Sequence, residues 1–137
     1  MTDLATSIRQ IRLLRLHRGE DILQSLRRYV ADNQIANALI LSGFGSVTHY
    51  HFHVVADGKL PPAEEYSLGE RALDIVGMSG AVLNGRVHGH ITFTDDRAAL
   101  GGHLEEGCRV LTFAVVCLGV LETDADLSGW DRFAIQG

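Results

Sequence analysis

The sequence predicts a single α+β domain in which a mostly antiparallel, twisted sheet wraps around one main helix. Only one segment, near the N-terminus, has helical periodicity of useful length. The rest of the chain consists of short apolar segments separated by glycines and turns, which favours strands. A chain of 137 residues has the size of one domain and can form a hydrophobic core without disulfides or metals. We therefore expect one domain over residues 1–137, with a core over about 11–121 and a tail over 122–137.

The first expected elements are a strand and then the helix. Residues 10–17 alternate imperfectly between apolar and polar side chains, which favours a strand. The helix is expected over about 21–33, because Asp21 can accept hydrogen bonds from the free N–H groups of a first turn. The apolar residues that share one face at helical spacing are Ile22, Leu23, Leu26, Tyr29 and Val30.

Six or seven strands are expected in total, joined by short turns. After the helix, strands are expected over 38–42, 47–55, 72–78, 82–94, 99–104 and 109–121. Gly43-Phe44-Gly45 is expected to form a turn, and residues 56–71 the longest loop. The last strand is apolar on both of its faces, which indicates a central strand or one covered by a partner subunit. In the tail, Trp130 and Phe133 are able to pack back onto the domain.

The charge distribution excludes a nucleic-acid binder that uses its whole surface. The net charge is −5, whereas affinity for phosphate backbones comes from neutralisation by Lys and Arg. Residues 1–30 hold six arginines against three acids, so a local basic face is possible there. The arginines that would contact phosphates are Arg12, Arg15, Arg27 and Arg28. The ordinary alternative is a solvated helix and strand edge.

Cysteine usage and hydropathy favour a cytoplasmic protein without membrane association. Cys108 and Cys117 lie nine residues apart in apolar surroundings, as expected of buried, reduced thiols. The N-terminal residues lack the basic and apolar regions of a signal peptide. The longest apolar stretch, 110–121, is shorter than the roughly 20 residues that a membrane span needs.

Three of the seven histidines meet on one face of an expected hairpin. The strands on either side of the polar turn 95–98 are expected to pair in antiparallel fashion. In the simplest register His90 lies directly opposite His103, and His88 lies opposite Glu105. A shift of one residue would send His103 to the other face of the sheet, so the cluster depends on this register.

Three imidazoles that converge from two strands are a typical ligand set for zinc or another divalent metal, with one position left open. We therefore predict that His88, His90 and His103 are metal ligands and that Glu105 is the acid/base group. Glu105 could also be a fourth ligand, an orienter of an imidazole or a surface residue. Nearby glycines, including Gly101 and Gly102, leave room around the cluster. The alternative is a set of solvent-facing histidines.

The other histidines are harder to interpret. His49, His51 and His53 share one side of a strand by strict alternation. They could form its solvated face, or gather at a subunit interface where protonation near pH 6 would loosen packing. His17 receives no assignment.

An ordered set of motifs resembles the plant and prokaryote conserved (PPC) domain over about residues 11–121. The motifs, in chain order, are Arg15-Leu16-x-x-Gly19-Glu20-Asp21, Leu41-Ser42-Gly43-x-Gly45-Ser46-Val47, Asp74-Ile75-Val76-x-Met78-Ser79-Gly80, His88-x-His90 and Gly101-Gly102-His103-Leu104. The resemblance implies an α+β domain that forms a homotrimer, with apolar strands packed between subunits. The family's histidine motifs fall on His88, His90 and His103, whereas His49, His51 and His53 lie outside its pattern.

The resemblance leaves three functional hypotheses. The fold of the family is similar to that of acetolactate decarboxylase, a zinc enzyme with three histidine ligands, which favours a metal site used for small-molecule binding or for lyase or hydrolase chemistry. Family members are also described as DNA-binding because plant relatives carry AT-hooks, but this sequence contains no Arg-Gly-Arg-Pro hook. The third hypothesis is a purely structural trimeric interaction module.

Overall fold

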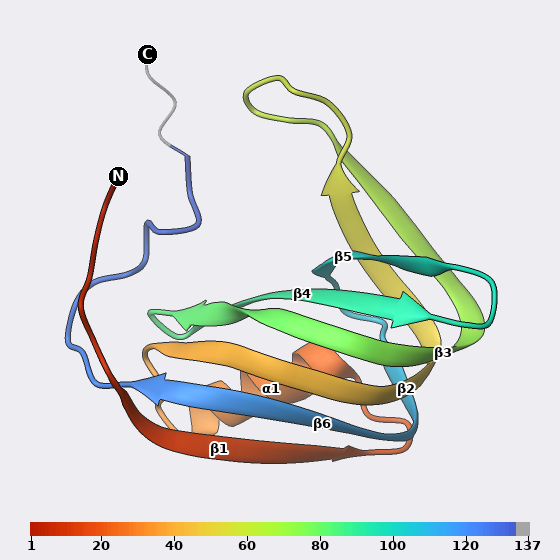
Figure 1. Ribbon diagram of the computed structural model, residues 1–137, viewed down its shortest axis with the longest axis horizontal. Helices are drawn as coiled ribbons and strands as arrows, with labels where there is room; N and C mark the ends of the chain where they lie inside the picture. Colours follow the sequence, from red (N-terminus) through yellow and green to blue (C-terminus); the bar gives the residue numbers. More distant parts are fainter. Residues whose placement is uncertain (134–137) are drawn as a thin grey trace.

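The structure is a computed structural model that describes residues 1–133, and in these the chain forms six strands and one helix (Figure 1). The elements are β1 (Ile8–His17), α1 (Ile22–Asp32), β2 (Ala38–Val55), β3 (Glu64–Leu83), β4 (Arg86–Thr94), β5 (Ala99–Leu104) and β6 (Arg109–Leu121). All strands belong to one antiparallel sheet in the order β1-β6-β2-β3-β4-β5. The α+β class, with an antiparallel sheet and one helix, is confirmed.

The sheet closes on itself at one end, because β5 pairs with two strands. It pairs with β4 along its length and also with the end of β2, where Phe52 lies opposite Leu104 and His53 opposite His103. Register shifts along β2 interrupt its ladder with β6, and such bulges bend a strand. The predicted turn at residues 43–45 is therefore wrong: the chain continues through it as one bent strand.

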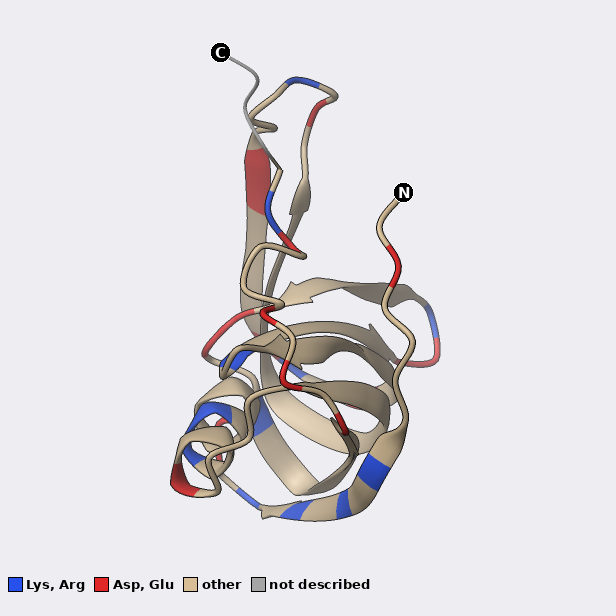
Figure 2. Cartoon of the chain, turned by 90° about the vertical axis from the view of Figure 1, so that its left-hand side faces the viewer, with Lys and Arg blue, Asp and Glu red and all other residues tan. Residues whose placement is uncertain are grey.

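Two further boundaries differ from the prediction. The loop expected over 56–71 covers only 56–63, since β3 begins at Glu64 and pairs with the end of β2 in an arm that projects from the body (Figures 1 and 2). The strand expected over 82–94 is divided by a two-residue turn at Asn84 and Gly85, both with positive φ. Asn-Gly is the dipeptide that such a hairpin turn favours, so this signal was present in the sequence.

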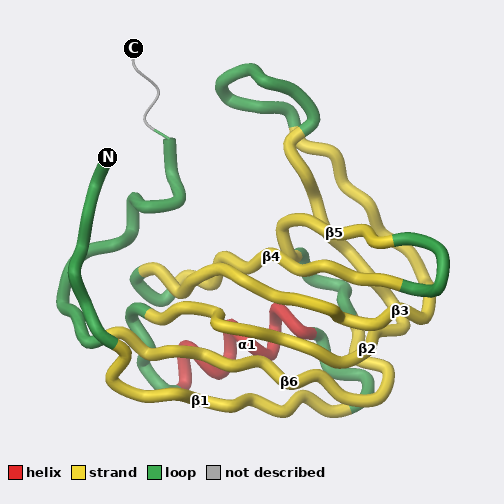
Figure 3. The backbone as a smooth tube through the Cα atoms, in the orientation of Figure 1, coloured by secondary structure: helices red, strands yellow, loops and turns green. Residues whose placement is uncertain are grey.

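The helix packs against one face of the sheet and forms the core with it (Figure 3). As predicted, Ile22, Leu23, Leu26 and Val30 are buried, and Tyr29 packs against the same cluster. From the sheet, the side chains of Phe93, Val110 and Val116 face this side and are buried completely. The other face of β6 is only partly covered.

The C-terminal tail is held by a residue other than those expected. Trp130 and Phe133 are each 49% exposed, whereas Leu127 is 4% exposed and fills the packing role. Cys108 is buried, Cys117 is partly buried, and both are free thiols. Among the described residues, no helix has the length and apolar character needed to cross a membrane.

Asp21 joins the helix to the loop between β5 and β6. Its Oδ1 accepts a hydrogen bond from the Gln24 N–H (3.0 Å), which is the predicted helix cap, and its Oδ2 accepts one from the Gly107 N–H (2.6 Å). The side chain is buried, so both N–H groups would lack a partner without it.

We predict that Asp21→Ala lowers the free energy of unfolding by about 1–3 kcal/mol, because a helix cap and a second buried hydrogen bond are lost. Urea unfolding followed by circular dichroism measures the change. Asp32→Ala, at an exposed position of the same helix, is the control and should alter stability by less than about 0.5 kcal/mol. Equal losses in both variants would contradict the prediction.

Candidate metal centre

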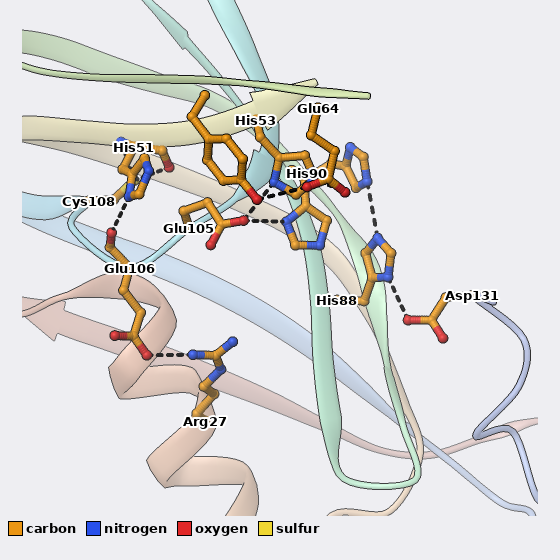
Figure 4. A network of polar contacts seen from close by, with 12 residues as sticks. Arg27, His51, His53, Glu64, His88, His90, Glu105, Glu106, Cys108 and Asp131 are labelled. Atoms are coloured by element: carbon orange, nitrogen blue, oxygen red, sulfur yellow. Dashed lines mark hydrogen bonds and ion pairs between the residues drawn. The ribbon is translucent and has the colours of Figure 1, made fainter. Parts of the chain in front are cut away.

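Four imidazoles and a carboxylate gather where β5 lies between β2 and β4 (Figure 4). His53 comes from β2, His88 and His90 come from β4, and His103 comes from β5. Glu105 follows the last residue of β5. The cluster therefore depends on three strands, and on the closure of the sheet rather than on the hairpin alone.

The predicted hairpin register is confirmed in part. Thr94 pairs with Ala99, and His90 pairs with His103. The expected position of Glu105 opposite His88 is wrong, because His88 pairs only with Ala81 of β3. The Glu105 N–H donates to the His51 carbonyl (3.1 Å), so the chain beyond β5 follows β2 and leaves β4.

His88 and His90 present their Nε2 atoms to each other at 3.3 Å, and the two rings are stacked. Two nitrogen ligands in tetrahedral geometry, each about 2.05 Å from a zinc ion, are separated by about 3.3 Å. The pair thus has the spacing of two ligands of one metal, although a hydrogen bond between two imidazoles also fits this distance. On the other side of its ring, His88 Nδ1 lies 2.7 Å from Asp131 Oδ2.

His103 lies at the centre of the cluster. Its ring centroid is 4.3 Å from that of His53, 4.6 Å from that of His88 and 5.6 Å from that of His90. Its Nδ1 atom is buried without a hydrogen-bond partner, and Glu105 Oε1 lies 3.5 Å from it. A buried nitrogen without a partner is costly, and a metal ion is one group that could satisfy it.

Among the described residues, one group of three His, Cys, Asp or Glu side chains has the spacing of a metal site, and it shares only His103 with the three predicted ligands. The ligand atoms of His53, His103 and Glu105 all lie within 4.8 Å of one another, and His53 Nδ1 is 2.6 Å from Glu105 Oε1. The structure thus brings His88, His90, His103 and Glu105 into one cluster, as the sequence predicted, and adds His53. The solvated-face interpretation is wrong for His53, whose side chain is only 14% exposed.

The three alternating histidines of β2 have different surroundings. His51 Nδ1 lies 2.7 Å from the Glu106 carbonyl oxygen, and His49 Nδ1 lies 2.8 Å from Thr48 Oγ1. Only His53 reaches the strand that carries His103. Its participation follows from the pairing of β2 with β5, which are about 50 residues apart, so no local pattern could have indicated it.

The neutral form is favoured at two of the four imidazoles, those of His90 and His103. Burial lowers the pKa of His90 and of His103, and the neighbouring imidazoles lower both further, while Glu105 opposes the shift at His103. Neutral imidazole is the form that binds a metal. Burial alone would raise the pKa of Asp131, but hydrogen bonds with His88 and Arg86 bring it below its ordinary value.

The four arginines proposed for phosphate contacts do not form one surface, although basic residues follow β1 and α1 (Figure 2). Arg12 donates to the Tyr29 hydroxyl on the helix side of β1 (3.3 Å). Arg15 lies three positions along the strand, on the opposite face, with its guanidinium over the ring of Phe113. Arg27 is paired with Glu106 at 2.5 Å, and Arg28 is exposed on α1.

Sequence comparisons match the chain to one domain family. The family model described as the Plants and Prokaryotes Conserved (PCC) domain matches residues 5–122. Two curated relatives, each named bifunctional protein GlmU, come from Synechococcus strains JA-3-3Ab and JA-2-3B'a(2-13) and are 31% and 32% identical over 116 and 106 residues. These matches cover 84% and 77% of this chain but 18% and 16% of the relatives, so the chain spans less than a fifth of their length.

Solved structures share the fold at low sequence identity. A metal-containing protein from Archaeoglobus fulgidus has a TM-score of 0.79 and 24% identity, over 91% of this chain and 89% of that chain. A plant- and prokaryote-conserved protein from Pyrococcus horikoshii has a TM-score of 0.75 and 19% identity, over 90% and 87%. A protein from Ralstonia eutropha JMP134 whose name proposes DNA binding has a TM-score of 0.69 and 24% identity, over 83% and 80%.

We predict that the metal-free protein loses stability as the pH falls below about 6.5, the ordinary histidine value. Because the folded-state pKa values of His90 and His103 are lowered, the unfolded chain binds more protons in this range. The contribution of these two histidines to the free energy of unfolding is fully present above pH 6.5. It is lost as the pH falls through their lowered folded-state pKa values. Urea unfolding with a chelator at pH 7.5 and 5.5 measures it. The double variant His90→Gln/His103→Gln should show a smaller difference between the two pH values, and an unchanged difference would refute the assignment.

Proposed function

The chain belongs to the Plants and Prokaryotes Conserved domain family, and from this premise we propose that it is a metal-binding protein. The proposed ligands of zinc or another divalent ion are His88, His90 and His103. The observation that carries the proposal is the 3.3 Å distance between the Nε2 atoms of His88 and His90, with His103 on the strand beside them. Three neutral imidazoles suit zinc better than magnesium or calcium, which prefer oxygen ligands.

Two further observations support a metal in this cluster. The buried Nδ1 of His103 has no hydrogen-bond partner and lies 3.5 Å from Glu105 Oε1, so it fits a metal bound together with His53 and Glu105, a group that shares His103 with the proposed ligands. The relative from Archaeoglobus fulgidus, whose fold this chain shares, is described as a metal-containing protein. His53 and Glu105 lie against His103 and complete the polar lining of the site.

We propose that the site serves small-molecule binding or lyase or hydrolase chemistry, in which the metal when bound supplies a Lewis acid. Glu105 is the proposed acid/base group, because its Oε1 forms a hydrogen bond with His53 Nδ1 (2.6 Å) and its side chain is 24% exposed to solvent. A proton held between these two atoms could move to a bound molecule. A pocket of about 220 Å³ is lined by His90, Met78 and Ser79, and His90 is the one residue of the cluster that lines it.

We also propose that the protein is a homotrimer. An exposed apolar patch covers the face of the sheet opposite the helix, and its members are Ile11, Leu13, Leu39, Leu41, Phe44 and Phe113. Soluble proteins rarely leave large contiguous apolar patches exposed. Contact with other subunits would cover this patch and would explain why β6 is apolar on both of its faces.

DNA binding is the second candidate, and the names of two structural neighbours favour it. A DNA-binding surface needs several cations on one face to contact successive phosphates. Arg12 and Arg15 lie on opposite faces of β1, and Arg27 is paired with Glu106. We therefore place metal binding first.

The two thiols favour a reducing compartment, and we propose the cytoplasm. Cys108 and Cys117 are both free. Burial raises the pKa of Cys108 to about 12, so this thiol is unreactive at neutral pH.

We predict that protein purified without a histidine tag contains about one zinc or other divalent ion per chain. His90→Ala should remove it, because two neutral imidazoles alone make a weak site. Elemental analysis after dialysis gives the metal content. His49→Ala, at a histidine outside the cluster, is the matched control and should keep the metal.

His53→Ala distinguishes the two overlapping ligand groups. If His88, His90 and His103 bind the metal, this variant keeps it. Loss of metal in His53→Ala with retention in His90→Ala would replace the proposed ligands by His53, His103 and Glu105. Wild-type protein without any stoichiometric metal would overturn the proposal and favour a structural interaction module.

We predict that the wild-type protein elutes as three chains and that Leu41→Lys shifts it towards the monomer, because a charge would be buried in the interface. Size-exclusion chromatography with light scattering measures the mass. Ala31→Lys, on the exposed side of α1, should leave the trimer intact. A monomeric wild type, or a trimer insensitive to Leu41→Lys, would exclude the proposed interface.

A further inference from the structure

The C-terminal tail is bound along the turn between β3 and β4. The side-chain amide of Asn84 forms two hydrogen bonds with the tail. Its Oδ1 accepts from the Leu127 N–H (2.9 Å), and its Nδ2 donates to Asp126 Oδ1 (2.8 Å). Asn37 Nδ2 donates to the Ala125 carbonyl (3.3 Å). The Leu127 side chain is buried, so the tail has both polar and apolar anchors.

This docking brings Asp131 to the Nδ1 side of His88, opposite the Nε2 atom that faces His90 (Figure 4). Asp131 Oδ2 lies 2.7 Å from His88 Nδ1, and Asp131 Oδ1 contacts the Arg86 guanidinium. Arg86 also donates to the Ser128 carbonyl at 3.2 Å, which ties the same turn of the tail to β4. The Asp131 side chain is only 15% exposed, so its contacts are largely shielded from water.

We propose that Asp131 is a positioning residue that fixes the tautomer of His88 for metal binding. An ionised carboxylate only accepts hydrogen bonds, so His88 Nδ1 must carry a proton and donate it to Asp131. The Nε2 lone pair is then free, and this is the atom that faces His90 Nε2. Carboxylates that hold ligand histidines in this way raise metal affinity. The inference rests on the proposed metal site, and Asp131 lies outside the residues 5–122 that match the family.

Arg86 makes the substitution Asp131→Asn unusually informative. Arginine is only a donor, so the carbonyl oxygen of the asparagine must face Arg86 and its NH₂ group must face His88. His88 Nδ1 then becomes an acceptor, and its proton moves to Nε2. A protonated Nε2 cannot bind a metal, although the shape of the side chain has hardly changed.

We predict that Asp131→Asn weakens zinc binding by about 10–100-fold, the range found for such supporting carboxylates. Competition with a chromophoric chelator measures the affinity. In the metal-free protein, the ¹⁵N shifts of His88 should change from the Nδ1–H to the Nε2–H tautomer. The same variant combined with Arg86→Met should recover part of the affinity, because the asparagine can then turn its carbonyl towards His88. Asp124→Asn, at an exposed position of the tail, is the control and should bind zinc as the wild type does.

The outcomes separate this inference from the proposed function. If the wild type binds zinc and Asp131→Asn binds it equally well with an unchanged His88 tautomer, the positioning role is excluded and the metal site remains. If Asp131→Asn loses affinity but Arg86→Met does not restore any of it and the tautomer stays the same, Asp131 acts only through the docking of the tail, and the inference fails. If the wild type binds no zinc, the proposed function fails, whereas the tautomer can still be read in the metal-free protein.

Discussion

The close approach of β5 to two neighbouring strands is the constraint on which the histidine cluster depends. A Cβ atom added to Gly101 would lie 2.1 Å from the Ile91 carbonyl oxygen of β4, and one added to Gly102 would lie 2.4 Å from the His53 carbonyl oxygen of β2. Neither position can carry a side chain without moving a backbone. The two glycines therefore allow β5 to lie between β4 and β2, and His103, the next residue, is placed against histidines from both.

This role of the glycines differs from the one that the sequence suggested. Gly101 and Gly102 were expected to leave room around the cluster, whereas neighbouring backbone occupies this room. The hairpin register was predictable because the 95–98 turn is short and polar, and Thr94 and Ala99 pair as the simplest connection requires. The single helix was predictable for a similar reason, since its cap and apolar stripe lie within a few turns. Both are local patterns.

The missed features are those that local patterns do not contain. His53 joins the cluster through a pairing of distant strands, and Asp131 joins it through a tail that shows no periodicity. The bend of β2 was interpreted as a turn because glycines at residues 43 and 45 mark turns and strand bulges alike. Sequence reasoning thus found the histidines that one hairpin carries, and the closed sheet and docked tail supply the groups that surround them.

The supporting groups divide the cluster into two halves with different chemistry. On one side, Asp131 and Arg86 hold His88 from behind, in a largely shielded contact that favours fixed geometry. On the other side, Glu105 shares a hydrogen bond with His53 and stays partly open to solvent. A carboxylate shared between an imidazole and solvent can exchange a proton, whereas one held between an imidazole and a guanidinium is committed to both. The two carboxylates on opposite sides of the cluster are therefore suited to different roles, Asp131 to the orientation of His88 and Glu105 to proton transfer.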